Sequence, residues 1–200
     1  MTPLTIIKGD ATSPQAKGRK VIAHLCNDLG GWGKGFVLAV SRRWPEPERD
    51  YRAWHRHRAG NDFGLGAVRL VRVAPDVWVA NMVGQRGIRA GSGGPPIRYD
   101  AVQRCLTALG DEVQALGASV HMPRIGCGLA GGTWSRVEPL VVGALCARHR
   151  GDRLRPRVAH HPAVPGRAAI GVGRRTVRSV GSDRTDTACR VRVSAQSVPR

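Results

Sequence analysis

Residues 124–132 read RIGCGLAGG and decide the expected fold, because they join an apolar run, residues 119–122 (SVHM), to an apparent helix over 134–147. Glycines let backbone N–H groups approach an anion without obstruction from side chains, and a helix N-terminus adds a favourable field. A tight connection that needs positive φ angles explains one such loop equally well. The stretch therefore predicts a strand, a loop and a helix, with phosphate binding as one of two explanations.

Two further strand-like runs precede this loop in the chain. Residues 5–7 (TII) lead into Lys8-Gly9-Asp10, and residues 21–26 (VIAHLC) lead into a glycine-rich stretch at 30–35 and an apolar helix start. Short continuous apolar runs are typical of strands that are buried on both faces. In a layered α/β domain the loops that follow parallel strands meet at one edge of the sheet, where ligands bind. We therefore expect the loops after Lys8, Cys26 and Pro123 to form one cleft, together with the loop that follows Val83.

The remaining segments continue the alternation of strands and helices. Residues 46–57 and 99–116 have helical spacing, 68–73 and 77–83 have strand character around an Ala-Pro-Asp turn, and 84–96 form a long loop of Gly, Ser and Pro. Strands that alternate with helices predict a three-layer α/β/α domain with a mixed, mostly parallel central sheet over residues 1–147.

Residues 148–200 have a different composition. They hold 13 arginines, no lysine and no aromatic residue, and their apolar residues show no regular spacing. We predict a basic tail that is disordered or translated out of frame, that makes few contacts with the domain and that carries no site.

The formal net charge of +18 suggests a polyanionic partner. Nucleic acid is not favoured, because no aromatic residues are interleaved with the basic residues of the tail. The five cysteines are scattered singly and no histidine stands at ligand spacing, so we expect neither a disulfide framework nor a metal site. No apolar run approaches the length of a membrane span, which predicts a cytoplasmic protein with no membrane partner.

Three ordered motifs resemble the macrodomain family. They are KGDAT at residues 8–12, HLCND at 24–28 followed by GWGKG at 31–35, and MPRIGCGL at 122–129 with Trp134. The branch that they resemble holds terminal ADP-ribose protein glycohydrolase and its bacterial relatives. The resemblance covers residues 4 to about 147 and implies a macrodomain that binds ADP-ribose or ADP-ribosylated protein and needs no cofactor. It also implies a closing strand after the last helix, which the basic tail predicted here would leave missing.

The resemblance also implies which residues contact ADP-ribose. Asp10 corresponds to the acid that recognises adenine, with the backbone of Ala11 against the ring, although Asp10 could instead cap the following turn. Asn27 falls where the family holds the distal ribose. The loop that closes over this ribose corresponds to Gly33, Lys34 and Gly35. The loop that wraps the diphosphate corresponds to Gly126, Cys127, Gly128 and Leu129.

The catalytic pattern of that branch is not matched. The glycohydrolase uses a lysine just beyond the fourth strand and an aspartate directly after GCGL, whereas this chain has VGQR at 83–86 and Ala130. We therefore expect a water-based reaction. Asn27 is expected to hold the ribose, Asp28 to act as a weak base, Gln85 to position the water and Arg86 to stabilise the leaving carboxylate.

For two other polar residues we favour a structural role over a catalytic one. His24 is expected to be a hydrogen-bonded core imidazole. Cys127 is expected to pack in the loop, although neighbouring N–H groups could lower the pKa of its thiol.

Three functions remain open from the sequence. The first is hydrolysis of ADP-ribose from protein, most readily from Glu or Asp esters because a carboxylate is a good leaving group. The second is a non-catalytic reader of ADP-ribose, which the missing lysine and aspartate favour. The third is a phosphatase of ADP-ribose 1''-phosphate, because GWGKG also resembles a loop of the yeast enzyme of that type.

Overall fold

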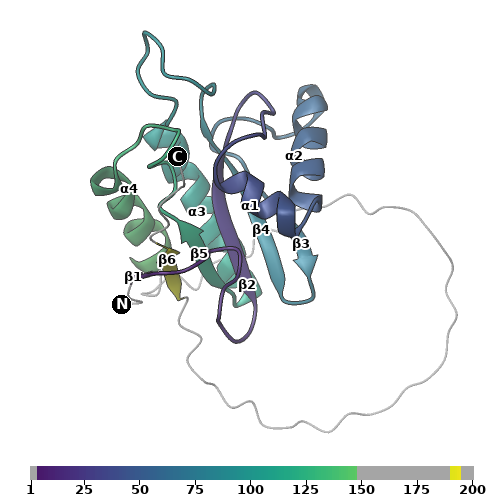
Figure 1. Ribbon diagram of the computed structural model, residues 1–200, viewed down its shortest axis with the longest axis vertical. Coiled ribbons are helices and arrows are strands. Elements are labelled where there is room, and N and C mark those ends of the chain that lie inside the picture. Colours follow the sequence, from purple (N-terminus) through teal and green to yellow (C-terminus); the bar gives the residue numbers. More distant parts are fainter. Residues whose placement is uncertain (1–3, 148–189, 195–200) are drawn as a thin grey trace, which may run out of the picture.

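The computed structural model describes residues 4–147 and 190–194 of the 200-residue chain. They form a six-stranded sheet with the order β1-β6-β5-β2-β4-β3 (Figure 1). Neighbouring strands run parallel except for β3 and β4, which form an antiparallel hairpin. The strands are β1 (Leu4–Ile7), β2 (Lys20–Asn27), β3 (Val68–Ala74), β4 (Val77–Gln85), β5 (Ser119–Pro123) and β6 (Val191–Ser194).

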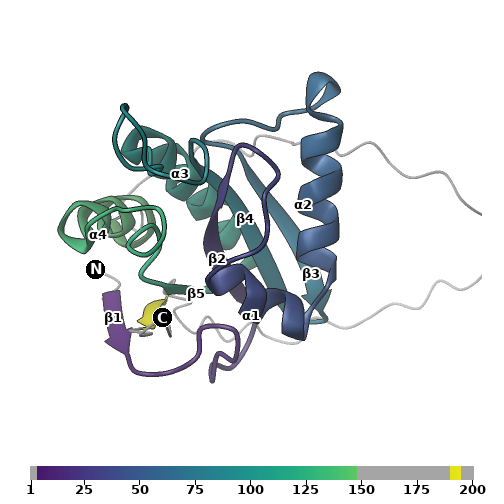
Figure 2. The same ribbon diagram turned by 45° about the horizontal axis from the view of Figure 1, so that its top comes forward.

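Helices cover both faces of the sheet, as Figure 2 shows. One face carries α1 and α2, and the other carries α3 and α4. The three-layer α/β/α prediction is therefore confirmed. The helices are α1 (Phe36–Arg43), α2 (Glu46–Arg56), a 3₁₀ turn at Arg58–Gly60, α3 (Tyr99–Leu116) and α4 (Trp134–Val141), which continues as a π-helical turn through Val142–Cys146.

The alternation of side chains along β2 divides the core in two. Val21 and Leu25 pack in the cluster formed with α3 and α4, whereas Ile22 and Cys26 pack in the cluster formed with α1 and α2. All eight residues of β2 are buried, which explains why its sequence is a nearly continuous apolar run. The central strand is thus held from both sides, and the loop that follows it starts from a rigid position.

Strand β6 corrects the prediction for the tail. Val191–Ser194 lies between β1 and β5, with Val191 beside Leu4 and Val120 and with Val193 beside Met122. Both valines are fully buried, so this part of the tail belongs to the core and the sheet has its closing strand. The prediction was wrong here because the segment is only four residues long and its two apolar side chains alternate with Arg192 and Ser194. The rest of the predicted tail, residues 148–189 and 195–200, lies outside the described residues.

No helix within residues 4–147 is both long enough and apolar enough to cross a membrane.

Candidate active site

Four strand ends meet at one edge of the sheet. β1, β2, β4 and β5 all run in the same direction, so the loops that follow Ile7, Asn27, Gln85 and Pro123 leave from the same edge. This arrangement is the one predicted from the three glycine-rich or acidic loops. It places residues from the whole length of the domain around one cleft.

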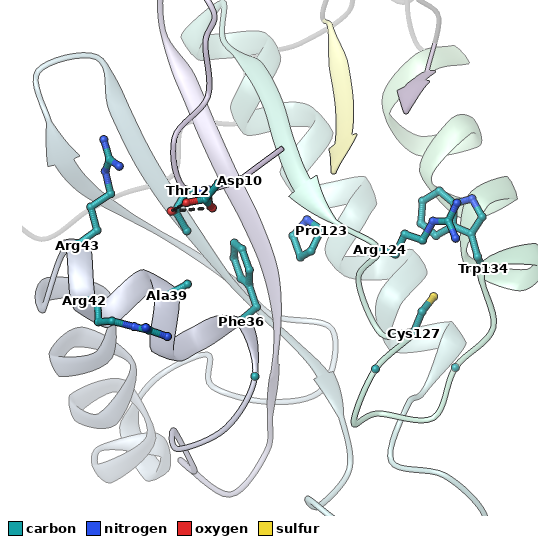
Figure 3. A pocket seen from close by; sticks show the side chains of 13 residues that line it. Asp10, Thr12, Phe36, Ala39, Arg42, Arg43, Pro123, Arg124, Cys127 and Trp134 are labelled. Atoms are coloured by element: carbon teal, nitrogen blue, oxygen red, sulfur yellow. Dashed lines mark hydrogen bonds between the residues drawn. The ribbon is translucent and has the colours of Figure 1, made fainter. Parts of the chain in front are cut away.

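The cleft consists of two adjoining cavities. The larger has a volume of about 930 Å³, and its lining residues are drawn in Figure 3, where Asp10 and Thr12 appear between Arg43 and Pro123 and Arg124 lies on the far side from α1. The smaller has a volume of about 520 Å³. The residues that line both are Gly35, Phe36, Pro123, Arg124 and Gly128.

The two glycine loops approach each other where the cavities join. The side chain of Leu129 lies so close to Gly35 that a Cβ there would stand 3.5 Å from its Cδ1 atom. Within the described part of the chain, the backbone N–H groups of Gly128 and Leu129 donate no hydrogen bond. Helix α1 also begins here without a side-chain cap at Gly35. Backbone donors without a hydrogen bond and a helix N-terminus therefore lie at the junction, and such groups suit an anionic ligand.

Glycine is required at two positions of the loop over residues 124–133. Gly126 has a φ of +73°, and its carbonyl accepts a hydrogen bond of 2.8 Å from the Gly132 N–H group. A Cβ on Gly132 would stand 2.7 Å from that carbonyl oxygen and 2.5 Å from Ile97 Cδ1. The loop thus needs two small residues to close on itself. At Gly128, in contrast, a Cβ would meet nothing within 4 Å, so the space beside Gly128 is open to a ligand.

Asp10 lines the larger cavity and also caps its own turn. Its carboxylate accepts hydrogen bonds from the Thr12 N–H group at 2.8 Å and from the Thr12 hydroxyl at 2.9 Å. Both of the alternatives left open by the sequence are therefore compatible with its position, because a carboxylate has about four acceptor sites. Ala11, beside it, is buried.

Of the four predicted catalytic residues, Gln85 lines the smaller cavity. It is the last residue of β4 and is half-buried. Asn27, the last residue of β2, is buried and organises its own loop. Its Oδ1 atom accepts the N–H groups of Leu29 and Gly31 at 3.0 Å, and its Nδ2 atom donates to the Gly31 carbonyl at 2.7 Å. Asn27 lines neither of the two cavities.

Asp28 and Arg86 lie in the loops that follow β2 and β4. The Asp28 carboxylate accepts the Gly87 N–H group at 2.7 Å, and the Asp28 N–H group donates to the Gln85 carbonyl at 2.9 Å. Asp28 therefore ties the loop after β2 to the loop after β4. The Arg86 side chain is exposed, and the Arg86 N–H group donates to the Pro96 carbonyl at 2.8 Å.

His24 is confirmed as a core imidazole, although it also touches the smaller cavity. Its Nε2 atom lies 2.8 Å from Asn81 Oδ1, while Asn81 Nδ2 donates to the Pro47 carbonyl. The orientation of the Asn81 amide makes Nε2 the protonated nitrogen of the ring. Burial lowers the pKa of His24 to about 4, so the ring is neutral at physiological pH.

Cys127 is held in the loop, with its Sγ atom 3.4 Å from the Ile125 carbonyl oxygen. Burial raises the pKa of its thiol, and the nearby Arg124 only partly opposes this effect. A lowered thiol pKa, which the sequence left open, is therefore not found. Among the described residues no group of three or more His, Cys, Asp or Glu side chains could hold a metal ion.

Sequence reasoning missed the contribution of α1 to the cleft. Phe36, Ala39 and Arg42 follow one another at intervals of three residues and line the larger cavity, together with Arg43. A helix that begins at the glycine loop must run along the cleft, and this spacing was the available signal. Exposed arginines on a short helix gave no such signal by themselves.

Comparisons with known proteins bear on the family and the fold of the chain. No model of a known protein family matches the chain. The solved structure of a macrodomain protein from Streptomyces coelicolor is 62% identical, with a TM-score of 0.65 over 72% of this chain and 92% of that one. Chromodomain-helicase-DNA-binding protein 1-like of Danio rerio is 32% identical over 160 residues, which are 74% of this chain but 15% of that protein.

A shorter match concerns an enzyme. ADP-ribose 1''-phosphate phosphatase of Meyerozyma guilliermondii is 32% identical over 73 residues, which are 36% of this chain and 42% of that protein. The similarity to the Streptomyces structure extends over nearly all of that structure. The chain belongs to the macrodomain family.

Proposed function

We propose that the cleft binds ADP-ribose and that the chain hydrolyses ADP-ribose from modified protein, with Glu and Asp esters as the preferred linkage. In this proposal the adenine lies beside Asp10 in the larger cavity. The diphosphate lies between residues 33–35 and 126–129, where the two glycine loops meet. The distal ribose lies in the smaller cavity, beside Gln85.

The division of the cleft into two cavities supports this placement. ADP-ribose has an adenosine and a ribose joined by a diphosphate, and the cleft has two cavities joined where backbone donors are free. Membership of the macrodomain family supports the ligand itself, as does the short match to an enzyme that acts on ADP-ribose 1''-phosphate.

An ester linkage needs the fewest catalytic groups. Water attacks C1'' of the distal ribose, the bond from C1'' to the ester oxygen breaks, and the Glu or Asp carboxylate leaves with the bonding electrons. The water then loses its proton to solvent. A carboxylate is stable as an anion at neutral pH, so no general acid has to protonate it. This suits a site in which His24, the one imidazole among the described residues that line the smaller cavity, is neutral and donates to Asn81.

Gln85 is the residue that we assign to the attacking water. It lines the smaller cavity, and its amide can both accept from and donate to a water molecule. Asn27 and Asp28 act as positioning residues, because their side chains hold the two loops that flank this cavity. Arg86, whose side chain is exposed, is left to meet the leaving carboxylate or the protein that carries it.

Release of ADP-ribose from a glutamate-modified protein tests this proposal. We expect the full chain to release ADP-ribose, and we expect Gln85→Ala to lower the rate by roughly tenfold to a hundredfold because the water is no longer positioned. Gln114→Ala is the matched control, since Gln114 is exposed on α3 and lies outside both cavities. Borohydride treatment during turnover should trap no lysine adduct; an adduct on Lys34 would contradict the water-based reaction.

A phosphatase is the second candidate, and the match to ADP-ribose 1''-phosphate phosphatase favours it. The same experiment with ADP-ribose 1''-phosphate as substrate separates the two activities by the release of phosphate. Binding of ADP-ribose with no product from either substrate would instead identify a reader.

A further inference from the structure

Three exposed apolar side chains stand on the loops around the smaller cavity. Leu29, Ile88 and Leu129 are 57%, 53% and 65% exposed, and they belong to the loops after β2, β4 and β5, respectively. Leu129 lines the cavity. Leu29 and Ile88 come directly after the two residues whose hydrogen bond ties the loops after β2 and β4 together, beyond the same edge of the sheet (Figure 1). Apolar side chains that gather on a surface mark a site of contact with a partner.

Two arginines of the loop after β4 add positive charge to this surface. Arg86 follows Gln85, Arg89 follows Ile88, and both arginine side chains are exposed. Neither arginine lines a cavity, so the diphosphate does not account for them. Neither belongs to a helix, so a helix dipole does not account for them either. The ion pairs found within the described residues involve other basic side chains, which leaves both charges available to a partner.

The loops around the smaller cavity hold little negative charge. Residues 28–35, 86–98 and 124–133 contain five basic residues and one carboxylate, that of Asp28. Asp28 is half-buried, and its carboxylate accepts the Gly87 N–H group at 2.7 Å. The surface around the mouth of the cavity is therefore both apolar and basic, and it is complementary to an acidic partner.

We propose that the exposed residues of these loops form a docking surface for the polypeptide that carries ADP-ribose, and that this surface selects an acidic segment. The docking surface consists of Leu29, Arg86, Ile88, Arg89 and Leu129. The inference rests on the proposed function, which places C1'' of the distal ribose beside Gln85. The carrier is bonded to C1'', so its chain must leave the cavity across these loops. An extended polypeptide advances about 3.5 Å per residue, so carboxylates within roughly three positions of the modified residue can reach the two arginines.

The apolar part of the docking surface favours a polypeptide over nucleic acid. Proteins that bind single-stranded nucleic acid use aromatic side chains on which the bases stack. Residues 86–98 contain no aromatic residue, and Trp32 of the loop after β2 is buried. Leucine and isoleucine instead contact the aliphatic side chains of a polypeptide, while exposed arginines pair with its carboxylates.

Release of ADP-ribose from three peptides by the full chain tests the inference. Each peptide carries one ADP-ribosylated glutamate, and the residues that flank this glutamate are acidic, neutral or basic. We expect kcat/KM to be about fivefold higher for the acidic peptide than for the neutral one at low ionic strength, as two exposed ion pairs would give, and the ratio to shrink at high salt. The difference should lie in KM, because the docking contacts are the same before and during cleavage of the bond.

Charge reversal assigns the preference to the docking surface. Arg89→Glu should lower the ratio of the acidic to the neutral peptide to about one, because it replaces an attraction by a repulsion. Arg72→Glu is the matched control, since Arg72 is exposed and pairs with Trp78 near the start of β4, at the opposite edge of the sheet. The control should keep the ratio of the parent chain. If Arg89→Glu also keeps it, acidic segments do not dock here and the inference fails.

The outcomes separate this inference from the proposed function. Equal kcat/KM for the three peptides would overturn the inference while leaving hydrolysis intact. If no peptide is cleaved, hydrolysis is contradicted, and the Kd values of the same peptides decide: tighter binding of the acidic peptide supports the docking surface, and equal or absent binding overturns it. A single-stranded oligonucleotide that carries ADP-ribose is the fourth ligand. A preference for this oligonucleotide over the acidic peptide would overturn the inference in favour of nucleic acid.

Discussion

The two ends of the cleft are built in different ways. The end with Gln85 rests on β2 and β4, which are buried, share a long register and are tied again beyond their ends by Asp28. The end with Asp10 follows β1, an edge strand whose Ile6 and Ile7 are exposed and whose partner is β6. One end is therefore held by two paired strands within residues 20–85, and the other by four residues near the end of the chain. We expect the Asp10 end to be the more easily disrupted.

A charge in β6 is the strongest test of this difference. Val193→Asp places a carboxylate at a fully buried position beside Ile6 and Met122 and should lower the free energy of unfolding by about 3–5 kcal/mol. Urea denaturation of the full chain measures the effect. Thr5→Asp is the control, since Thr5 is exposed on β1 and its substitution should stay within about 0.5 kcal/mol. If Val193→Asp is as stable as the parent, β6 does not form the closing strand.

Asp10→Ala tests the contact that we propose between Asp10 and the adenine of ADP-ribose. We expect the affinity for ADP-ribose to fall by about 1.5–3 kcal/mol, because a charge-assisted hydrogen bond to the adenine amine is lost. Calorimetry measures this loss. Thr12→Val is an informative comparison, because it removes the hydroxyl group that donates a hydrogen bond to Asp10 but keeps the Asp10 carboxylate. If both variants weaken binding equally, Asp10 acts through its turn and does not contact adenine.

Asp28→Ala tests the hydrogen bond that joins the loops after β2 and β4 at the Gln85 end of the cleft. Loss of the hydrogen bond to the Gly87 N–H group should lower the free energy of unfolding by about 1.5 kcal/mol and should slow the release of ADP-ribose. Asp28→Asn keeps an acceptor oxygen and should recover most of the stability. Recovery of stability without recovery of rate would point instead to Asp28 as a base.

Acid should destabilise the whole sheet. Burial is the main cause that lowers the pKa of His24 and of His121 to about 4, below the 6.5 of the unfolded chain. The unfolded state therefore binds more protons between these values, so stability is complete above pH 6.5 and is lost as the pH falls toward 4. Each histidine contributes up to about 1.4 kcal/mol per pH unit. His121→Gln should make the decline shallower in urea titrations at pH 7, 6 and 5; an unchanged slope would contradict the assignment.

The sequence was most informative where apolar periodicity was continuous. The helix over Tyr99–Leu116, the antiparallel hairpin and the buried run of β2 could all be predicted, because their side chains face a core on a regular pattern. The loops could be placed at one edge because parallel strands require it. Strand β6 could not, because two alternating valines in an arginine-rich segment resemble any coil.

The site was predictable in outline and less so in detail. The glycine loop at 124–132 and the positions of Asp10 and Gln85 follow from strand ends. The hydrogen bonds of the Asn27 and Asp28 side chains depend on how the loops after β2 and β4 fold against each other. The spacing of residues along the sequence does not determine the distance between these two loops. The arginines of the larger cavity likewise depend on which face of α1 turns toward the cleft.

Calorimetry of ADP-ribose with the full chain and with Gly128→Glu tests the central claim most directly. Gly128 lines both cavities, and a Cβ there meets nothing within 4 Å, so the variant should fold as the parent does while its carboxylate obstructs and repels the diphosphate. We predict one ADP-ribose bound per chain, and an affinity at least about tenfold lower in Gly128→Glu with an unchanged melting temperature. Failure of the parent chain to bind ADP-ribose, or equal affinity in the two proteins, would contradict the account.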